Sequence, residues 1–322
     1  MSFKILGSAL KDEVRNHLIS VREIKKAQIE NFFYERYGEV RNLSKNPLII
    51  ESLPRFSRAY TNLGFNDPAY KQAMTQYNHL LIYFLIQHGY QNILLADAEG
   101  YIVYGVKDDK SLGTNIKSRE YSSTAIGEIF REGRTKLVFS DLIRSEKTKD
   151  FMCLGACPVY DQSNTLLGVV IVEIPYSKLD AIVSQRGGLG KTGEIYIVGS
   201  DKLMRSKSRF SKQNTILEME IDTKASRDAL RGNTGIQMIK DKRNLPVLSA
   251  YTPLDYLKDV QWVLLVEKDE KEVLNPFRLL EAYLFVIAAI IVVIAIIFLR
   301  FFKGKKRVTK IPQETLIPSN RD

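Results

Sequence analysis

The chain has 322 residues, of which 45% are hydrophobic and 26% are charged, and its formal net charge is +10. This length fits one large or two small folded domains, and the composition excludes a chain that is disordered throughout. Apart from a basic cluster near the C-terminus, the positive charges are scattered. They lack the basic runs interleaved with aromatic residues that favour nucleic-acid binding, so we expect no nucleic-acid partner.

The first segment, residues 1–89, is predicted to be helical. Apolar residues recur at three- and four-residue spacing along residues 8–45, which predicts one long stalk helix. The apolar stripe is broad for a single contact, so we expect this helix to pack on its own domain and also on its copy in a homodimer. A second helix is predicted from Asp67, as the N-cap before Pro68, to about His88.

Residues 90–180 change to the patterns that indicate strands. Two apolar runs flank a turn in residues 92–106, and the helix-like stretch SREYSSTAIGEIFREG follows. The runs KLVFSDLI, FMCLGACPVY and LLGVVIVEI predict three more strands, which gives five strands with one inserted helix. The preceding helices are expected to cover one face of this sheet. Cys153 and Cys157 lie too far apart on one strand to form a disulfide, and we predict that both are core residues.

Residues 181–276 partly repeat this order. The run EIYIVGSDKLMRSKS at 194–208 echoes the first hairpin, with a strand, an Asp, a turn and a second strand. The segment 250–274 echoes 156–179 in the same way, so we predict two related α/β modules in tandem rather than one continuous sheet. The run GLGKT is not a phosphate-binding loop, because the first glycine of that motif would fall on Gln185.

A run of apolar residues, AYLFVIAAIIVVIAIIFL, extends from Ala282 to Leu299. At a rise of about 1.5 Å per residue it is long enough to cross a hydrocarbon core of about 30 Å, and we predict one transmembrane helix at residues 279–302. The residues before it carry mixed charges, whereas the residues from its end onward are basic: Arg300, Lys303, Lys305, Lys306, Arg307 and Lys310. This asymmetry predicts a short basic cytoplasmic tail, 303–322, and a chain that lies outside the cytoplasm before the span.

The N-terminus has neither the apolar region of a signal peptide nor a first transmembrane helix. Export of a large region without either is unexpected, so we expect an upstream segment that carries a first anchor. The alternative is a tail-anchored protein whose domain lies in the cytoplasm. The charge asymmetry around the span favours the first interpretation.

The run GGLGKTGEIYIVGSDKLMRSKSRF, residues 187–210, resembles the membrane-proximal module of double-Cache sensor regions in bacterial chemotaxis receptors and related sensors. VLSAYTPLD and QWVLLVEKDEKEVLNPF are similar to the closing strands of that module. VREIKKAQIENFF and GYQNILLADAEGYIVYGV resemble the long helix and first hairpin of the membrane-distal module. The resemblance covers about residues 14–277. It implies an α+β fold in which a long N-terminal helix carries two tandem PAS-like α/β (Cache) modules, followed by the one C-terminal transmembrane helix.

The resemblance assigns the membrane-distal module to residues 90–180 and the membrane-proximal module to residues 181–276. It implies a sensor in the cell (inner) membrane that binds a small molecule outside the cytoplasm, as methyl-accepting chemotaxis proteins do, and that signals through an unidentified cytoplasmic partner. The alternative is a stand-alone membrane-anchored binding protein that acts through a partner, because the residues after the span match no output module. The segment after Asp141 also lacks the Tyr-Pro-Ser that the resemblance leads us to expect.

In such a family the distal module is the usual ligand binder. Its candidate residues combine aromatic walls with opposite charges, and an Arg with an Asp grips a zwitterion, so an amino acid or an organic acid is the expected ligand class. The ligand-binding candidates are Tyr104, Arg119, Tyr121, Asp141 and Tyr160.

The remaining polar motifs predict no catalysis. In MRSKSRF, Arg205 and Arg209 share one face of a predicted strand, where they bind an anion or pair with carboxylates such as Asp201 or Glu194, and we favour the pairing. The three histidines lie at wide spacing in helical regions, without a metal-ligand or triad pattern. We therefore predict no catalytic residue, no metal site, no cofactor and no enzymatic activity.

Overall fold

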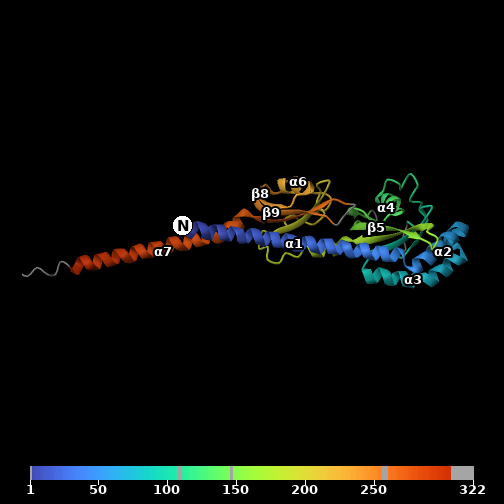
Figure 1. The fold of residues 1–322 in the computed structure, drawn as a ribbon, viewed down its shortest axis with the longest axis horizontal. Helices are drawn as coiled ribbons and strands as arrows, with labels where there is room; N and C mark the ends of the chain where they lie inside the picture. The colour runs from blue at the N-terminus through green and yellow to red at the C-terminus, as the bar shows by residue number, and fades with distance from the viewer. Residues whose placement is uncertain (1, 108–110, 146–147, 256–259, 306–322) are drawn as a thin grey trace, which may run out of the picture.

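The computed structural model describes residues 2–107, 111–145, 148–255 and 260–305 (Figure 1). Its helices are α1 (Ser2–Ser44), α2 (Pro47–Leu63), the 3-10 turn η1 (Gly64–Asn66), α3 (Pro68–His88), α4 (Ala125–Gly133), α5 (Tyr176–Val183), α6 (Lys224–Leu230) and α7 (Glu270–Lys305). Its strands are β1 (Asn92–Asp97), β2 (Ile102–Gly105), β3 (Val138–Phe139), β4 (Ile143–Arg144), β5 (Phe151–Tyr160), β6 (Leu166–Pro175), β7 (Glu194–Gly199), β8 (Gly235–Lys240), β9 (Pro246–Leu254) and β10 (Trp262–Asp269).

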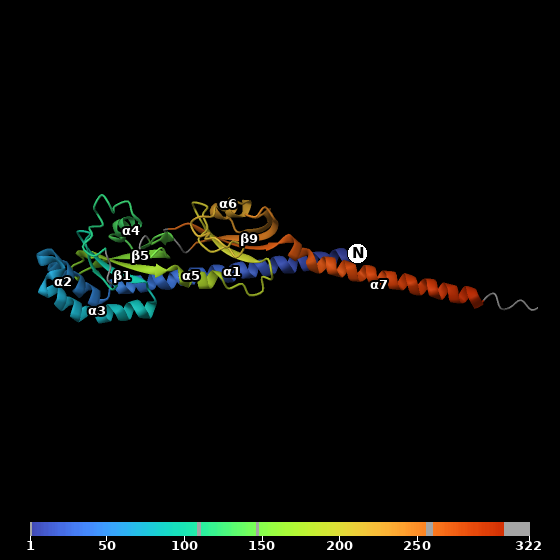
Figure 2. The same cartoon turned by 180° about the vertical axis from the view of Figure 1, so that it is seen from behind.

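Helix α1 runs along both β-sheets, so the predicted long N-terminal helix is confirmed (Figures 1 and 2). Its buried residues recur every three or four positions, which places them on one side of the helix. They are Leu18, Arg22, Lys25, Ile29, Phe33, Arg36, Val40 and Leu43, and Ser44 at the end of the helix is buried as well. Three of them are cations that donate hydrogen bonds to backbone carbonyls of other elements, for example Lys25 Nζ to Ile182 O at 2.6 Å. Burial of these charges is therefore compensated by hydrogen bonds.

Helix α3 begins and ends as its sequence predicts. The side chain of Asp67 accepts a hydrogen bond from the backbone N–H of Ala69 at 2.7 Å, Pro68 is the first helical residue, and Gly89 ends the helix in the left-handed region. Helix α2 lies outside the two predicted helices of this segment. It has its own N-cap, because the Asn46 side chain accepts a hydrogen bond from Leu48 N.

The six-stranded sheet lies farther from α7, and we call it the distal sheet. Its strand order is β2-β1-β6-β5-β3, with β4 also paired to β5, and all pairs are antiparallel. One face packs on α1, α2 and α3, as expected for the helix layer. The run KLVFSDLI forms two short strands, β3 and β4, rather than one. Both cysteines are buried and free.

The four-stranded sheet, which we call the proximal sheet, has the order β7-β10-β9-β8 and is also antiparallel. One face packs on α1 and α5, and the other is covered by α6. The prediction of a second strand within residues 194–208 is wrong. After β7 the chain turns at Lys202, whose φ is 65°, and makes only the isolated bridges Val198–Met204 and Leu203–Glu220.

Helix α7 follows β10 directly and extends away from both sheets (Figure 2). Its stretch Ala282–Arg300, 19 residues long, is apolar enough to span a membrane by length and composition, and it is not buried against any other part of the chain. Among the residues that the structure describes there is therefore one candidate membrane span, at the position where the sequence predicts it. The module boundaries given above stay predictions.

Candidate functional site

The face of the distal sheet that points away from the helix layer is covered by α4 and by the turns of residues 111–124. Thr124 caps α4 by accepting a hydrogen bond from Gly127 N at 3.4 Å. Apolar side chains fill the space beneath this cover: Leu94, Ala96, Ile102, Ile116, Ile129, Phe130, Val138, Met152, Leu154, Ala156, Val169 and Ile171. The cover itself consists of turns and one short helix. Backbone hydrogen bonds tie its start to the sheet, from Ile102 N to Thr114 O at 3.0 Å and from Gly113 N to Ile102 O at 2.8 Å.

Three of the five predicted ligand-binding residues lie on this side of the distal sheet. Tyr121 is half-buried against the apolar core just described, and Arg119, two residues earlier, is exposed. Tyr160, at the end of β5, donates a hydrogen bond from its hydroxyl to Arg134 O at 3.3 Å. These residues supply an aromatic surface and a cation at the cover.

Tyr104 lies on the opposite face of the sheet. Its ring is fully buried and stacks on Phe56 of α2 with a centroid distance of 4.7 Å. Its hydroxyl donates to Asn78 Oδ1 of α3 at 2.7 Å. A register shift between Leu95 and Ala96 in the β1–β2 pair accompanies this placement. The structure therefore does not bring Tyr104 together with Tyr121.

Asp141, the fifth candidate, lies at the junction of the two sheets. Arg205 donates to both carboxylate oxygens of Asp141, from Nε to Oδ1 and from Nη2 to Oδ2, each at 2.8 Å. Trp262 Nε1 also donates to Asp141 Oδ1 at 2.8 Å. Such a two-pronged contact is strong and directional. Asp141 thus joins the distal sheet to β10 and to the loop after β7, and we call this arrangement the junction clamp.

Arg205 carries a second ion pair with Asp201, at 2.9 Å, which is the pairing favoured from the sequence. Its side chain is only 3% exposed, whereas that of Asp141 is 35% exposed. Burial disfavours the charged form of Arg205, but the two carboxylates outweigh burial and raise its pKa. The cation is therefore held by carboxylates from both sides of the junction. The partner at Asp141 was missed because 64 residues separate the two positions.

A buried polar row crosses the face of the proximal sheet that α6 covers. Glu194 of β7 lies directly opposite Glu267 of β10, and Glu267 lies opposite Ser249 of β9. All three side chains are buried. Ser249 Oγ donates to Glu267 Oε1 at 2.9 Å, and Ser208 Oγ donates to Glu194 Oε1 at 2.7 Å. Two like charges in neighbouring cross-strand positions repel each other unless a cation or a proton intervenes.

Lys242, in the β8–β9 turn, provides that cation. Its ammonium donates to Glu194 Oε2 at 2.6 Å and lies 4.2 Å from the centre of the Tyr196 ring. Burial raises the pKa of the Glu267 carboxyl to about 7, and hydrogen bonding and the Lys242 charge only partly offset this. The polar row was not predicted, because its members come from three strands and a turn that are distant in the sequence.

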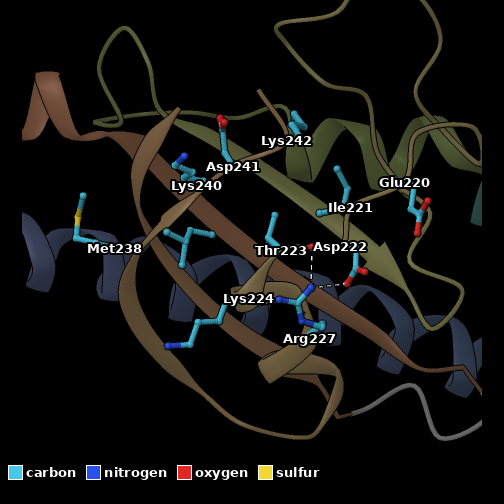
Figure 3. A pocket seen from close by; sticks show the side chains of 11 residues that line it. Glu220, Ile221, Asp222, Thr223, Lys224, Arg227, Met238, Lys240, Asp241 and Lys242 are labelled. Atoms are coloured by element: carbon cyan, nitrogen blue, oxygen red, sulfur yellow. Dashed lines mark hydrogen bonds and ion pairs between the residues drawn. The ribbon is translucent and has the colours of Figure 1, made fainter. Parts of the chain in front are cut away.

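A groove of about 420 Å³ opens between the segment leading into α6 and the end of β8 (Figure 3). Lys242 lines this groove and also contacts Glu194 of the polar row. Asp241 and Lys242 line one part of it, together with Ile221 and Ile239. The remaining lining residues are Glu220, Asp222, Thr223, Lys224, Arg227, Met238 and Lys240. Arg227 Nη1 donates to Asp222 at the groove wall, at 2.9 Å. The groove is thus polar and carries charges of both signs.

Comparisons with known proteins agree with this architecture. A family model described as a Cache domain matches residues 4–277. The chain is similar in structure to the ligand-binding domain of the Campylobacter jejuni chemoreceptor Tlp3 in complex with 4-methylisoleucine, with a TM-score of 0.58, 13% identity and coverage of 82% of this chain and 94% of that chain. No curated protein matches the chain in a sequence search.

Two further similar structures come from pseudomonads. One is the ligand-binding domain of Pseudomonas fluorescens chemoreceptor CtaA with L-isoleucine, with a TM-score of 0.52, 13% identity and coverage of 83% and 97% of the two chains. The other is the ligand-binding domain of the Pseudomonas aeruginosa PAO1 amino-acid chemoreceptor PctC with GABA, with a TM-score of 0.54, 15% identity and coverage of 79% and 99%. At these identities the similarity shows a shared fold.

The junction clamp leads to a first prediction. Asp141→Ala and Arg205→Ala should each lower the free energy of unfolding by about 2 kcal/mol, because each removes the charge-assisted hydrogen bonds between the two side chains. The double variant should lose at least about 1 kcal/mol less than the sum of the two. Denaturant unfolding of the full chain in detergent measures this cycle. Arg144→Ala is the control, since Arg144 is 55% exposed and lies 3.9 Å from Glu218, and it should change stability little. Additive losses at Asp141 and Arg205 would contradict the clamp.

The buried polar row leads to a second prediction, on pH. The pKa of Glu267 is about 7 in the folded chain against 4.5 for an ordinary Glu, so the folded state binds its proton more tightly. The free energy of unfolding should therefore fall as the pH rises from about 4.5 to 7, and the loss should persist above that range. Glu267→Gln should remove this loss, leaving a chain about 3 kcal/mol more stable than the wild type at pH 8 but similar at pH 4.

Denaturation curves across this pH range provide the measurement. Glu99→Gln serves as the control, because the Glu99 side chain is 78% exposed. If the wild type and Glu267→Gln have the same pH profile, Glu267 is not the group that titrates.

Proposed function

This chain belongs to the Cache domain family, and we propose that it senses a small molecule outside the cytoplasm while anchored in the cell membrane. Cache domains are sensory ligand-binding modules, and the similar solved structures are ligand-binding domains of chemoreceptors. The observation that carries the proposal is the division of the distal sheet into two unlike faces. One face is fixed on a helix layer, and the other lies beneath a loop-rich cover that carries Arg119, Tyr121 and, at its edge, Tyr160.

We assign the ligand to the space between this cover and the distal sheet, within residues 90–180. Arg119 supplies a guanidinium for a carboxylate, and Tyr121 and Tyr160 supply aromatic surface, which suits an amino acid or another small organic acid. Apolar side chains now pack this space, so ligand binding would require the cover of residues 111–124 to shift. Tyr104 and Asp141 are left out of the proposed site, because their side chains are engaged elsewhere.

The anchoring part of the proposal rests on α7. Its apolar stretch is exposed along its whole length, which disfavours a soluble core helix, and basic residues follow it in the sequence. We propose that the segment after the span is cytoplasmic. We also propose that two chains pair along α1, where Ile24 is 56% exposed.

Ligand binding is tested with the full chain in detergent. Thermal-shift screening of amino acids, organic acids and amines should give at least one stabilising compound, and calorimetry should then give its affinity. Arg119→Ala should weaken that affinity by about ten- to a hundredfold, because a charge-assisted hydrogen bond is lost. Arg58→Ala is the matched control, an exposed arginine on the helix layer, and should leave the affinity unchanged. Equal effects of the two substitutions would remove Arg119 from the site.

Topology is tested by reporters fused to the C-terminus of the chain encoded by its native gene. A reporter that works only in the cytoplasm should be active, and one that works only after export should be inactive. The opposite pattern would overturn the proposed orientation.

A further inference from the structure

The group of charged side chains around Glu194 contains more carboxylates than cations. Its carboxylates are Glu194, Glu267, Asp241 and Asp269, and its cations are Lys242 and Arg243. Arg243 is occupied by two of these carboxylates, because its guanidinium donates to Asp241 at 2.6 Å and to Asp269 at 2.5 Å. Among the residues that the structure describes, Lys242 is therefore the cation that remains for the pair formed by Glu194 and Glu267. Arg209 lies nearby, but its guanidinium donates to the Gly193 carbonyl.

The environment of the Lys242 ammonium is that of a bound amine. A carboxylate oxygen of Glu194 lies 2.6 Å away, and the face of the Tyr196 ring lies 4.2 Å away. Carboxylates combined with aromatic faces are the usual protein environment for ammonium groups. Tyr196 is 0% exposed, and its hydroxyl lies near Glu267 without a well-aligned hydrogen bond to any described residue. This pocket thus offers polar groups beyond those that Lys242 uses.

The turn that carries Lys242 is organised independently of Lys242. The side chain of Asp241 accepts hydrogen bonds from the backbone N–H groups of Arg243 and Leu245, at 2.8 and 3.0 Å. The Lys242 side chain itself lines the groove of about 420 Å³ beside α6, as Figure 3 shows. The Lys242 ammonium covers Glu194 Oε2, so rotation of this one side chain toward the groove would expose that oxygen while the turn keeps its shape.

We propose that Glu194, Glu267 and Tyr196 form an ammonium site in the proximal sheet, which Lys242 fills in this structure and which a small primary amine, reaching it through the groove, occupies in place of Lys242. The site is separate from the ligand position assigned to the distal sheet. Because the Lys242 ammonium is covalently attached to the chain, its effective concentration at the site is high. In the wild type a free amine therefore competes with it only at elevated concentration. Removal of the Lys242 ammonium should convert the pocket into an open amine receptor.

Chemical rescue of a Lys242 variant tests the site. Lys242→Ala should lower the melting temperature of the full chain in detergent by about 6 °C or more, because two buried carboxylates lose their cation. Methylammonium chloride should restore at least half of this loss. Tetramethylammonium chloride at the same concentration should restore none of it, because it has no N–H group to donate to Glu194. The wild type should respond to methylammonium with less than a tenth of the shift.

Lys240→Ala is the matched control, since Lys240 lines the same groove but is exposed, and it should neither lose stability nor respond to methylammonium. Lys242→Met, which keeps an apolar stem, provides a second variant if the alanine chain does not fold. Adding Glu194→Gln to either variant should abolish the rescue. The proposal is overturned if loss of Lys242 leaves stability unchanged, or if methylammonium stabilises no better than tetramethylammonium.

Discussion

One continuous helix constrains this fold. Helix α1 spans about 65 Å at the usual rise per residue, and both sheets bury one face against the same side of it. Neither sheet can change its position on α1 without uncovering apolar side chains such as Leu18 or Val40. The buried cations of α1 add directional contacts to this packing, because Arg22 and Lys25 donate hydrogen bonds to the backbone carbonyls of Gly235 and Ile182. The two sheets are thereby fixed to one axis, and the junction clamp joins them through Asp141 and Trp262, whose ring packs on Phe33 of α1.

Local patterns explain which parts of the fold were predictable. The stripe in α1, the caps of α3 and the apolar strands follow from periodicity and capping, which act over a few residues. Residues 1–89 were predicted to be helical, but α2 was given no bounds of its own, although Asn46 and Pro47 form a normal helix start. The strand predicted after Asp201 is replaced by a turn and isolated bridges, and Arg205 in this segment pairs with Asp141 in the β3–β4 connection, a contact that periodicity cannot indicate.

The candidate sites depend even more on contacts between distant segments. Residue types led to the prediction that Tyr104 and Asp141 bind a ligand. In the fold the polar group of each has a partner, Asn78 for Tyr104, and Arg205 and Trp262 for Asp141. The polar row of the proximal sheet depends on strand register, because Glu194 and Glu267 become neighbours only when β7 pairs with β10. The register between these two strands cannot be read from a single sequence.

The join between β10 and α7 has a mechanical consequence. Asp269 ends the strand and Glu270 begins the helix, so no flexible linker separates the proximal sheet from the apolar stretch of α7. The first turn of α7 is also held from the side, since Glu272 accepts hydrogen bonds from the backbone of Lys191 and Thr192. Helix α7 is therefore rigidly attached to the proximal sheet and cannot move independently of β10. A small rotation of β10 would therefore turn and tilt the whole of α7, including its far end, because no hinge lies between them to absorb the movement.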